Sequence, residues 1–221
     1  MSSIPKKPGL VSRPALHVLL DPEWSRGRDV LTVAGAAIDG GATVIQLRDK
    51  KASTRLLVEQ GLALRELTCE RGVLFVVNDR IDVALAVGAD GVHIGQDDDM
   101  PVQFARQLLG SQRILGISAG SLAEGAAAVA ADADYLSIGP IYPTRAKADA
   151  GPAIGTSLLA ELAIRYTTPL IGIGGITAKN AGEVIQAGAT GIAVITAVVS
   201  AEDIAAATRE LATALFETQR R

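Results

Sequence analysis

The chain alternates short β-branched runs with longer stretches of helical spacing, and it does so eight times. The expected strands are residues 15–20, 43–47, 74–77, 91–95, 114–117, 135–138, 170–173 and 191–195. The expected helices are residues 28–38, 53–71, 80–87, 100–109, 121–131, 156–165, 178–186 and 202–216. Strict alternation with buried, Val/Ile-rich strands is typical of a parallel sheet. Eight such units in 221 residues predict a single-domain α/β fold, the closed (β/α)₈ TIM barrel.

The composition is that of one globular domain. The chain is 48% hydrophobic and 20% charged, an apolar content that disordered chains lack. Residues 15–221 are expected to form the barrel. Residues 1–14 contain lysines and prolines but no apolar core of a signal peptide, so we expect a flexible N-terminal tail there.

Charge and cysteine content narrow the classes of function. The formal net charge is −3 with both signs spread along the chain, so neither nucleic acid nor a membrane is an expected partner. The single cysteine, Cys69, cannot form an internal disulfide. We therefore expect a cytoplasmic protein that binds small molecules, and the sequence leaves a homo-oligomer open.

Two neighbouring strands end in acidic and amide side chains instead of ordinary turn residues. Asn78 and Asp79 follow one strand, and Gln96, Asp97 and Asp98 follow the next. Since the carboxyl ends of parallel strands share one edge, these groups should gather where α/β folds bind ligands.

The second expected strand ends in an amide and two cations. Side chains alternate along a strand, so Gln46, Arg48 and Lys50 should project from the same side at the top of the barrel. Taken alone, Arg48 and Lys50 are as well explained as solvated charges at a strand end. The acidic edge one and two strands away favours a shared pocket in which cations and carboxylates face each other.

Asp79 and Asp98 are the candidate ligands of a Mg²⁺ ion that carries a pyrophosphate group. Carboxylate oxygens suit this metal, and the cations suit the remaining phosphate charge. The alternative for the run from Asp97 to Asp99 is capping of the following helix. His93 lies in mid-strand, and we expect it to be a hydrogen-bonded structural histidine and not a general base.

Glycine-rich and small residues end the last two strands. Residues 172–176 and 193–196 lie where barrels of this type commonly bind a monophosphate, because glycine lets backbone N–H groups approach an anion. Tight turns without a ligand are the alternative.

The longest connection, residues 139–155, has the length of a lid, and its Thr144 and Lys147 could close over a phosphate. The competing interpretation of that connection is disorder without function.

Seven motifs in chain order carry a resemblance to a known family. They are QLRDK at 46–50, NDRIDVAL at 78–85, GADGVHIGQDD at 88–98, GIS at 116–118, GPIYPT at 139–144 with Lys147, GIGGI at 172–176 and AVIT at 193–196. The chain resembles the thiamine-phosphate synthases. That resemblance implies a transferase of thiamine biosynthesis that joins 4-amino-2-methyl-5-pyrimidinylmethyl diphosphate to 4-methyl-5-(2-hydroxyethyl)thiazole phosphate and releases pyrophosphate.

The resemblance also implies a role for each matching residue. Gln46 would contact the aminopyrimidine, and Thr144 would help to seat the substrates. The diphosphate would be held by Arg48, Lys50, Asn78 and Lys147, with Ser118 beside it; Arg48, Lys50, Ser118 and Lys147 would form the catalytic set. Asp79 and Asp98 would bind Mg²⁺, and the thiazole phosphate would bind Gly175, Ile195 and Thr196. Because the family's reaction is dissociative, no side-chain nucleophile is needed, and catalysis amounts to stabilising the leaving group and aligning the two rings.

The chain departs from the family pattern in two places. Gly120 follows GIS-Ala where the family commonly has histidine, and Ala146 stands in the lid where a threonine is common. Three other functions stay open. They are the related thiazole tautomerase, which needs neither metal nor pyrophosphate, a sugar-phosphate epimerase, which would need more histidines than His17 and His93, and a non-catalytic phosphate-binding protein.

Overall fold

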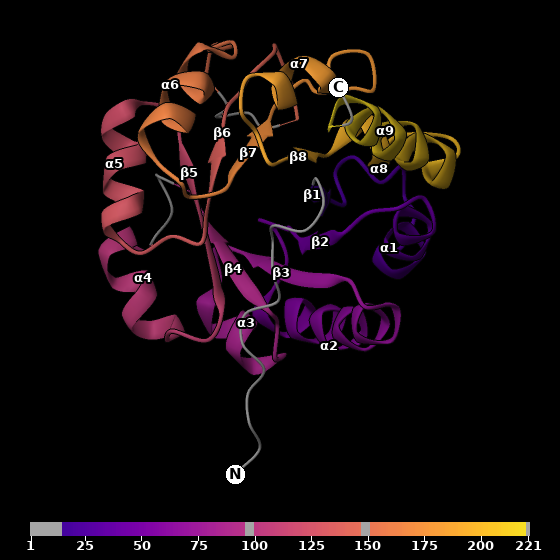
Figure 1. Cartoon of the computed structure of the whole chain (residues 1–221). Coiled ribbons are helices and arrows are strands. Elements are labelled where there is room, and N and C mark those ends of the chain that lie inside the picture. The colour runs from indigo at the N-terminus through magenta and orange to yellow at the C-terminus, as the bar shows by residue number, and fades with distance from the viewer. Residues whose placement is uncertain (1–14, 96–99, 147–150, 220–221) are drawn as a thin grey trace.

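Eight parallel strands close into a barrel in chain order in this computed structural model, which describes residues 15–95, 100–146 and 151–219 (Figure 1). The strands are β1 (Ala15–Leu20), β2 (Val44–Leu47), β3 (Leu74–Asn78), β4 (Gly91–Ile94), β5 (Ile114–Ala119), β6 (Tyr135–Ile138), β7 (Leu170–Ile173) and β8 (Gly191–Val194). Parallel pairing of β1 with β8 completes the ring. The predicted TIM barrel is confirmed, whereas the predicted tail, residues 1–14, lies outside the described residues.

Helices surround the barrel as an outer ring (Figure 1). They are α1 (Val30–Asp39), α2 (Thr54–Arg71), α3 (Ile81–Ala86), α4 (Val102–Leu109), α5 (Leu122–Ala130), α6 (Ser157–Arg165), α7 (Ala181–Gln186), α8 (Thr196–Val199) and α9 (Ile204–Gln219). The prediction of eight helices is wrong, because the described part of the chain contains nine. The missed helix, α8, has four residues, too few for a helical period to show in the sequence.

Local sequence explains where the helices next to the strands begin and end. Asp29 caps α1 by accepting hydrogen bonds from the backbone N–H groups of Leu31 and Thr32, at 3.1 and 2.9 Å. Ser53 caps α2 in the same way, and Gly72 ends that helix with φ of 63°, a conformation that favours glycine. None of the helices in the described ranges is both long and apolar enough to span a membrane.

Alternate strand residues fill the inside of the barrel. One cluster of buried residues joins strands on opposite sides of the ring, so it must cross the interior; we call it the interior cluster, and it consists of Ala15, Leu19, Ile114, Tyr135, Ile171, Ala193 and Ile195. The intervening strand residues, such as Leu16 and Val18, belong to the larger core between strands and helices.

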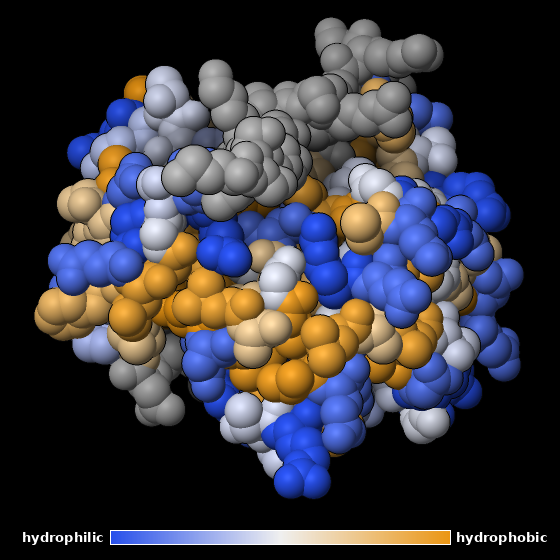
Figure 2. Space-filling view, turned by 90° about the horizontal axis from the view of Figure 1, so that it is seen from below, coloured by the Kyte–Doolittle hydropathy of each residue, from blue (hydrophilic) through white to orange (hydrophobic). Residues whose placement is uncertain are grey.

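Of the eight large exposed apolar side chains in the described residues, five lie on three neighbouring helices of the outer ring. Leu56 and Leu62 of α2, Leu85 of α3, and Phe104 and Leu108 of α4 are large and exposed. The view from below shows apolar surface interrupted by charged groups on this side (Figure 2). This surface makes a homo-oligomer physically reasonable, and that state stays a prediction.

A histidine is fully buried inside the barrel. His17 on β1 has no solvent exposure, and its ring meets Tyr135 edge-on with centroids 5.3 Å apart. Neither ring nitrogen has a hydrogen-bond partner among the described residues. Burial without a partner disfavours the charged ring, and it lowers the pKa of His17 from 6.5 to about 3.

His17 should therefore make the folded protein sensitive to acid. Below about pH 6.5 the unfolded chain binds a proton at this ring and the folded chain does not. The free energy of unfolding should fall by ~1.4 kcal/mol per pH unit from this residue as the pH drops from about 6.5 toward 3. Urea unfolding of the parent and of His17→Phe across this range should show a shallower pH dependence in the variant. Identical slopes would contradict the assignment.

Candidate functional site

A cavity of about 690 Å³ opens at the carboxyl ends of the strands. Each of the strands from β2 to β8 is followed by at least one residue that lines this cavity. The predicted site residues that line it are Lys50, Asn78, Asp79, Ser118, Thr144, Gly175, Ile195 and Thr196. The structure thus brings together eight residues from six strand ends, as the barrel prediction required. Two other predicted residues, Asp98 and Lys147, lie outside the described residues.

A sharp turn at the end of β3 aims an acidic side chain at the cavity. Asp79 has φ of 63°, a left-handed conformation that aspartate tolerates better than most residues. Its backbone N–H donates to the carbonyl of His93 at 2.7 Å, which ties the ends of β3 and β4 together. Lys50 Nζ lies 3.6 Å from the Asp79 carboxylate, so cation and anion face each other as expected.

Hard oxygen donors lie at this end of the cavity, but the described ones do not complete a metal site. Within residues 15–95, 100–146 and 151–219, no group of three or more His, Cys, Asp or Glu residues could hold a metal ion. The Asp79 carboxylate and the Asn78 amide oxygen are of the type that Mg²⁺ prefers. Magnesium binding by Asp79 and Asp98 therefore stays a prediction.

Gln46 and Arg48 lie deeper than the alternation of side chains suggested. Both are buried, at 2% and 7% exposure, and neither belongs to the described lining of the cavity. A guanidinium N–H of Arg48 donates to the carboxylate of Asp21, a residue that the sequence interpretation missed. Of the three side chains expected to project together, only Lys50 lines the cavity, and Gln46 and Arg48 are buried.

Three side chains, those of Tyr135, His93 and Ser118, are hydrogen-bonded in series from the barrel interior to the cavity. His93 Nδ1 lies 3.0 Å from the hydroxyl of Tyr135, and His93 Nε2 lies 3.0 Å from Ser118 Oγ. Burial raises the pKa of Tyr135, so its hydroxyl keeps its proton and can donate it to Nδ1. The ring proton on Nε2 would then point at Ser118. The prediction that His93 is hydrogen-bonded is confirmed, and its ring also lines the cavity.

The opposite end of the cavity is built from glycine backbone and the start of α8. Gly174 and Gly175 have φ of 96° and 64°, so both positions favour glycine. A side chain at Gly175 would also come within 2.6 Å of the Pro143 carbonyl oxygen. Thr196 begins α8, and its turn borders the cavity beside these glycines. Small residues here keep the backbone accessible to a ligand.

Both departures from the family pattern lie in the lining of the cavity. Gly120 lines the cavity, and its N–H donates a hydrogen bond to the Glu124 carboxylate at 2.6 Å. A side-chain carbon at Gly120 would make only ordinary van der Waals contacts, the nearest at 3.5 Å. Ala146 packs its methyl group against the interior cluster. The backbone at Gly120 therefore leaves space for a Cβ atom, whereas a hydroxyl at position 146 would adjoin apolar side chains.

Sequence reasoning missed three polar residues of the site. Glu124 and Ser137 line the cavity, and Asp21 neutralises Arg48 from behind its wall. Asp21 directly follows the first strand, so the rule that strand ends carry the site could have found it. Glu124 lies inside a helical run, where no local pattern separates it from a surface charge.

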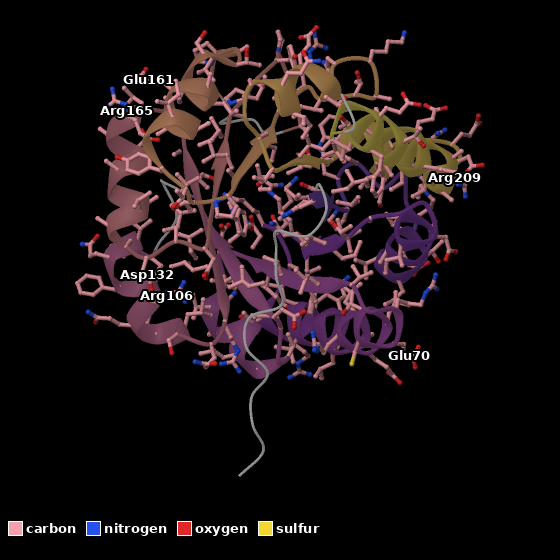
Figure 3. The ribbon with its side chains drawn as sticks, in the orientation of Figure 1. Glu70, Arg106, Asp132, Glu161, Arg165 and Arg209 are labelled. Carbon is pink, nitrogen blue, oxygen red and sulfur yellow. The ribbon has the colours of Figure 1, made fainter. Side chains whose placement is uncertain are left out.

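Charged side chains of the outer ring serve the helices and not the site. The labelled pairs in Figure 3, Arg106 with Asp132 and Glu161 with Arg165, lie on the outer helices and their connections, away from the barrel centre. Arg106 donates to the Asp134 carboxylate at 2.6 Å and to the Asp132 carbonyl at 2.8 Å, which fastens α4 to the turn before β6. Arg165 pairs with Glu161 one turn earlier in α6.

Loss of Asp21 should destabilise the fold by leaving Arg48 buried without its charge partner. Breaking a buried ion pair costs about 3–5 kcal/mol, whereas replacing both partners with apolar groups costs far less. Urea unfolding of Asp21→Ala should show that loss, and Asp21→Ala/Arg48→Met should recover most of it. Asp29→Ala, which removes a helix cap nearby, should cost about 1 kcal/mol and serves as control. A double variant no more stable than Asp21→Ala would refute the coupling.

Comparison with known proteins identifies the family. The family model described as thiamine monophosphate synthase matches residues 16–198. Thiamine-phosphate synthase of Chloroflexus aurantiacus is 52% identical over 204 residues, covering 92% of this chain and 94% of the relative. The enzyme of that name from Moorella thermoacetica is 50% identical over 196 residues, covering 89% and 93%. The solved structure of thiamine phosphate pyrophosphorylase from Pyrococcus furiosus superimposes with a TM-score of 0.85 at 42% identity, covering 92% and 96%. This chain belongs to the thiamine monophosphate synthase family of enzymes.

Proposed function

We propose that this enzyme joins 4-amino-2-methyl-5-pyrimidinylmethyl diphosphate to 4-methyl-5-(2-hydroxyethyl)thiazole phosphate, forming thiamine phosphate and pyrophosphate. The observation that carries the proposal is a single cavity with two unlike ends. Lys50 and Asp79 lie at one end, and Gly175 and Thr196 lie at the other. Two phosphorylated substrates that meet head to head need such a cavity, with their rings between the two anion sites.

The first end suits a diphosphate leaving group. Lys50, Asn78 and Ser118 can donate hydrogen bonds to its oxygens, and we assign Lys147 and the buried Arg48 to the same charge. Asp79, Asp98 and the Asn78 oxygen would hold Mg²⁺. When bound, the metal would neutralise part of the charge on the departing pyrophosphate. Asp79 also orients the Lys50 ammonium, which lies 3.6 Å from its carboxylate.

The bond that breaks joins the pyrimidinylmethyl carbon to a diphosphate oxygen. Pyrophosphate takes the bonding electrons, and the resulting pyrimidinylmethyl cation is captured by the lone pair of the thiazole nitrogen. No residue of the chain must act as nucleophile. The protein's part is to hold both rings in line, exclude water and stabilise the charge that develops on pyrophosphate.

Gln46 is our candidate for recognising the aminopyrimidine. Its Oε1 is buried, and no hydrogen-bond donor for it exists in the described part of the chain. A buried acceptor without a partner is costly, and the exocyclic amine of the pyrimidine would satisfy it. Gln46 lies in the barrel interior next to the layer of Leu19, below the cavity mouth, so the ring would enter deeper than the diphosphate.

The thiazole phosphate is assigned to the opposite end. Gly175 and Ile195 would contribute backbone N–H groups, and Thr196 would contribute its hydroxyl. The left-handed conformation of Gly175 keeps that backbone free of a side chain. Thr144, whose hydroxyl accepts the N–H of Ala146 at 3.1 Å, lines the cavity from the loop after β6 and would help to seat the substrates.

Pyrophosphate release with both substrates, with and without Mg²⁺, tests the proposal. We expect thiamine phosphate and pyrophosphate in equal amounts, only when both substrates are present, and far more slowly after Mg²⁺ is chelated. A thiazole tautomerase would release no pyrophosphate and need no metal. A phosphate-binding protein without catalysis would bind thiazole phosphate and form no product.

Thr196→Val should weaken binding of one substrate selectively. The variant loses a hydrogen bond to a charged group, worth roughly 1.5–3 kcal/mol, so KM for thiazole phosphate should rise at least about tenfold. KM for the pyrimidine diphosphate should change little. Thr213→Val, the same substitution on the exposed face of α9, serves as control. Equal effects on both substrates would count against this assignment.

Asp79→Asn should abolish most turnover while the fold persists. Asparagine accepts the left-handed conformation that Asp79 adopts, and it keeps the size of the side chain. If the carboxylate holds Mg²⁺, several kcal/mol of the barrier is at stake, on the order of a thousandfold in kcat, with partial rescue by raised Mg²⁺. We expect the same of Asp98→Asn.

Asp82→Asn is the matched control, because Asp82 is an exposed carboxylate on the neighbouring α3 that pairs with Arg80. It should leave turnover and its dependence on Mg²⁺ unchanged. Turnover of Asp79→Asn within about threefold of the parent at limiting Mg²⁺ would rule out the metal assignment, since 1.4 kcal/mol already means tenfold.

A further inference from the structure

We propose that Trp24 is a positioning residue that braces two walls of the cavity from behind. Trp24 lies in the β1–α1 loop, residues 21–29, and the described lining of the cavity does not include it. It is half-buried and packs against the interior cluster. Its kinetic consequences rest on the proposed function, whereas its structural consequences do not.

The first wall is the loop that follows β6. Trp24 Nε1 donates to the carbonyl oxygen of Ala146 at 3.2 Å, across 122 residues of sequence. Ala146 and Thr144 both line the cavity, and the Ala146 N–H is held by the Thr144 hydroxyl. The methyl of Ala146 rests on the same interior cluster as the indole ring. The indole thus holds the backbone of this wall by a hydrogen bond, and both groups rest on the same apolar cluster.

The second wall is α8, whose first residues Thr196 and Ala197 line the cavity. Ser200, at the C-terminal end of α8, donates its hydroxyl to the Trp24 carbonyl at 3.0 Å. Arg28 of the same loop donates to the carbonyl oxygens of Val199 and Ala201, at 2.6 and 2.8 Å. The β1–α1 loop therefore holds the end of α8 that faces away from the cavity.

The loop itself is rigid enough to transmit this positioning. The N–H of Trp24 donates to the Asp21 carbonyl at 3.0 Å, and the N–H of Arg28 donates to the Ser25 carbonyl at 3.1 Å. The Asp21 carboxylate is in turn fixed by Arg48, and it accepts the N–H of Glu23 at 3.1 Å. Trp24 thus connects both the loop after β6 and the end of α8 to the β1–α1 loop.

Because the chain contains one tryptophan, this brace can be observed directly. A ¹⁵N-labelled parent protein should show one indole N–H resonance, and that proton should exchange with solvent more slowly than in a free tryptophan side chain. An indole proton that exchanges at the free rate would overturn the proposal, whatever the activity.

Trp24→Phe tests the function of the brace, because it keeps an apolar ring and removes the N–H donor. Amide hydrogen exchange of the substrate-free variant should be faster than in the parent at the non-proline residues of 139–146. KM for both substrates should rise by roughly three- to tenfold, the effect of one lost hydrogen bond, with kcat changed by less than about twofold.

Asp29→Ala is the matched control, because Asp29 ends the same loop, caps α1 and contacts neither wall in the described structure. It should lower the melting temperature while leaving KM and the exchange at residues 139–146 as in the parent. Parental exchange at these residues in Trp24→Phe, or equal increases in both variants, would overturn the proposal. Faster exchange in Trp24→Phe but not in Asp29→Ala would support the brace, whatever the parent enzyme catalyses. A parent protein that made no thiamine phosphate would refute the proposed function and not the brace.

Discussion

Everything in this structure depends on the closure of the barrel between its first and last strands. β1 and β8 pair from Ala15 opposite Gly191 to Val18 opposite Val194. The contact is so close that a side-chain carbon at Gly191 would come within 2.3 Å of the Ala15 carbonyl oxygen, so glycine is required there. Because all eight strands then run the same way around one ring, every loop after a strand opens onto one mouth. Residues far apart in the sequence become neighbours for that reason alone.

The interior of the barrel contains polar side chains among its apolar ones. A barrel of this size is filled by side chains, yet His17, Gln46, His93, Ser137 and Tyr135 contribute polar groups to that filling. Tyr135 fits because position 116 is glycine; a side-chain carbon there would overlap its ring at 2.0 Å. The hydroxyl that this space admits contacts His93, and His93 contacts Ser118 at the cavity. The packing of Tyr135 in the barrel interior therefore also fixes the orientation of His93 and Ser118 at the cavity.

Much of the fold and part of the site follow from local pattern. Short β-branched runs alternating with helical spacing predict the strands to within one or two residues, since apolar periodicity is a property of neighbouring residues. The ends of those strands indicated Lys50, Asn78 and Asp79, and chain direction alone placed them at one edge. Glycine at positions 174 and 175 marked a tight backbone turn by residue type. The four residues of α8 left no such trace, because one helical turn is too short to show a period.

The sequence by itself determined the barrel, its direction and the chemical character of its mouth. Only the tertiary structure decided depth and pairing. Alternation tells which side of a strand a residue takes, and it placed Gln46, Arg48 and Lys50 together; the fold buries the first two and leaves the third in the cavity. The partners of Arg48 and Trp24 lie 27 and 122 residues away, Asp21 and the carbonyl of Ala146. Such contacts leave no periodic signal, because they depend on how closed strands bring their loops together and not on the spacing of residues along the chain.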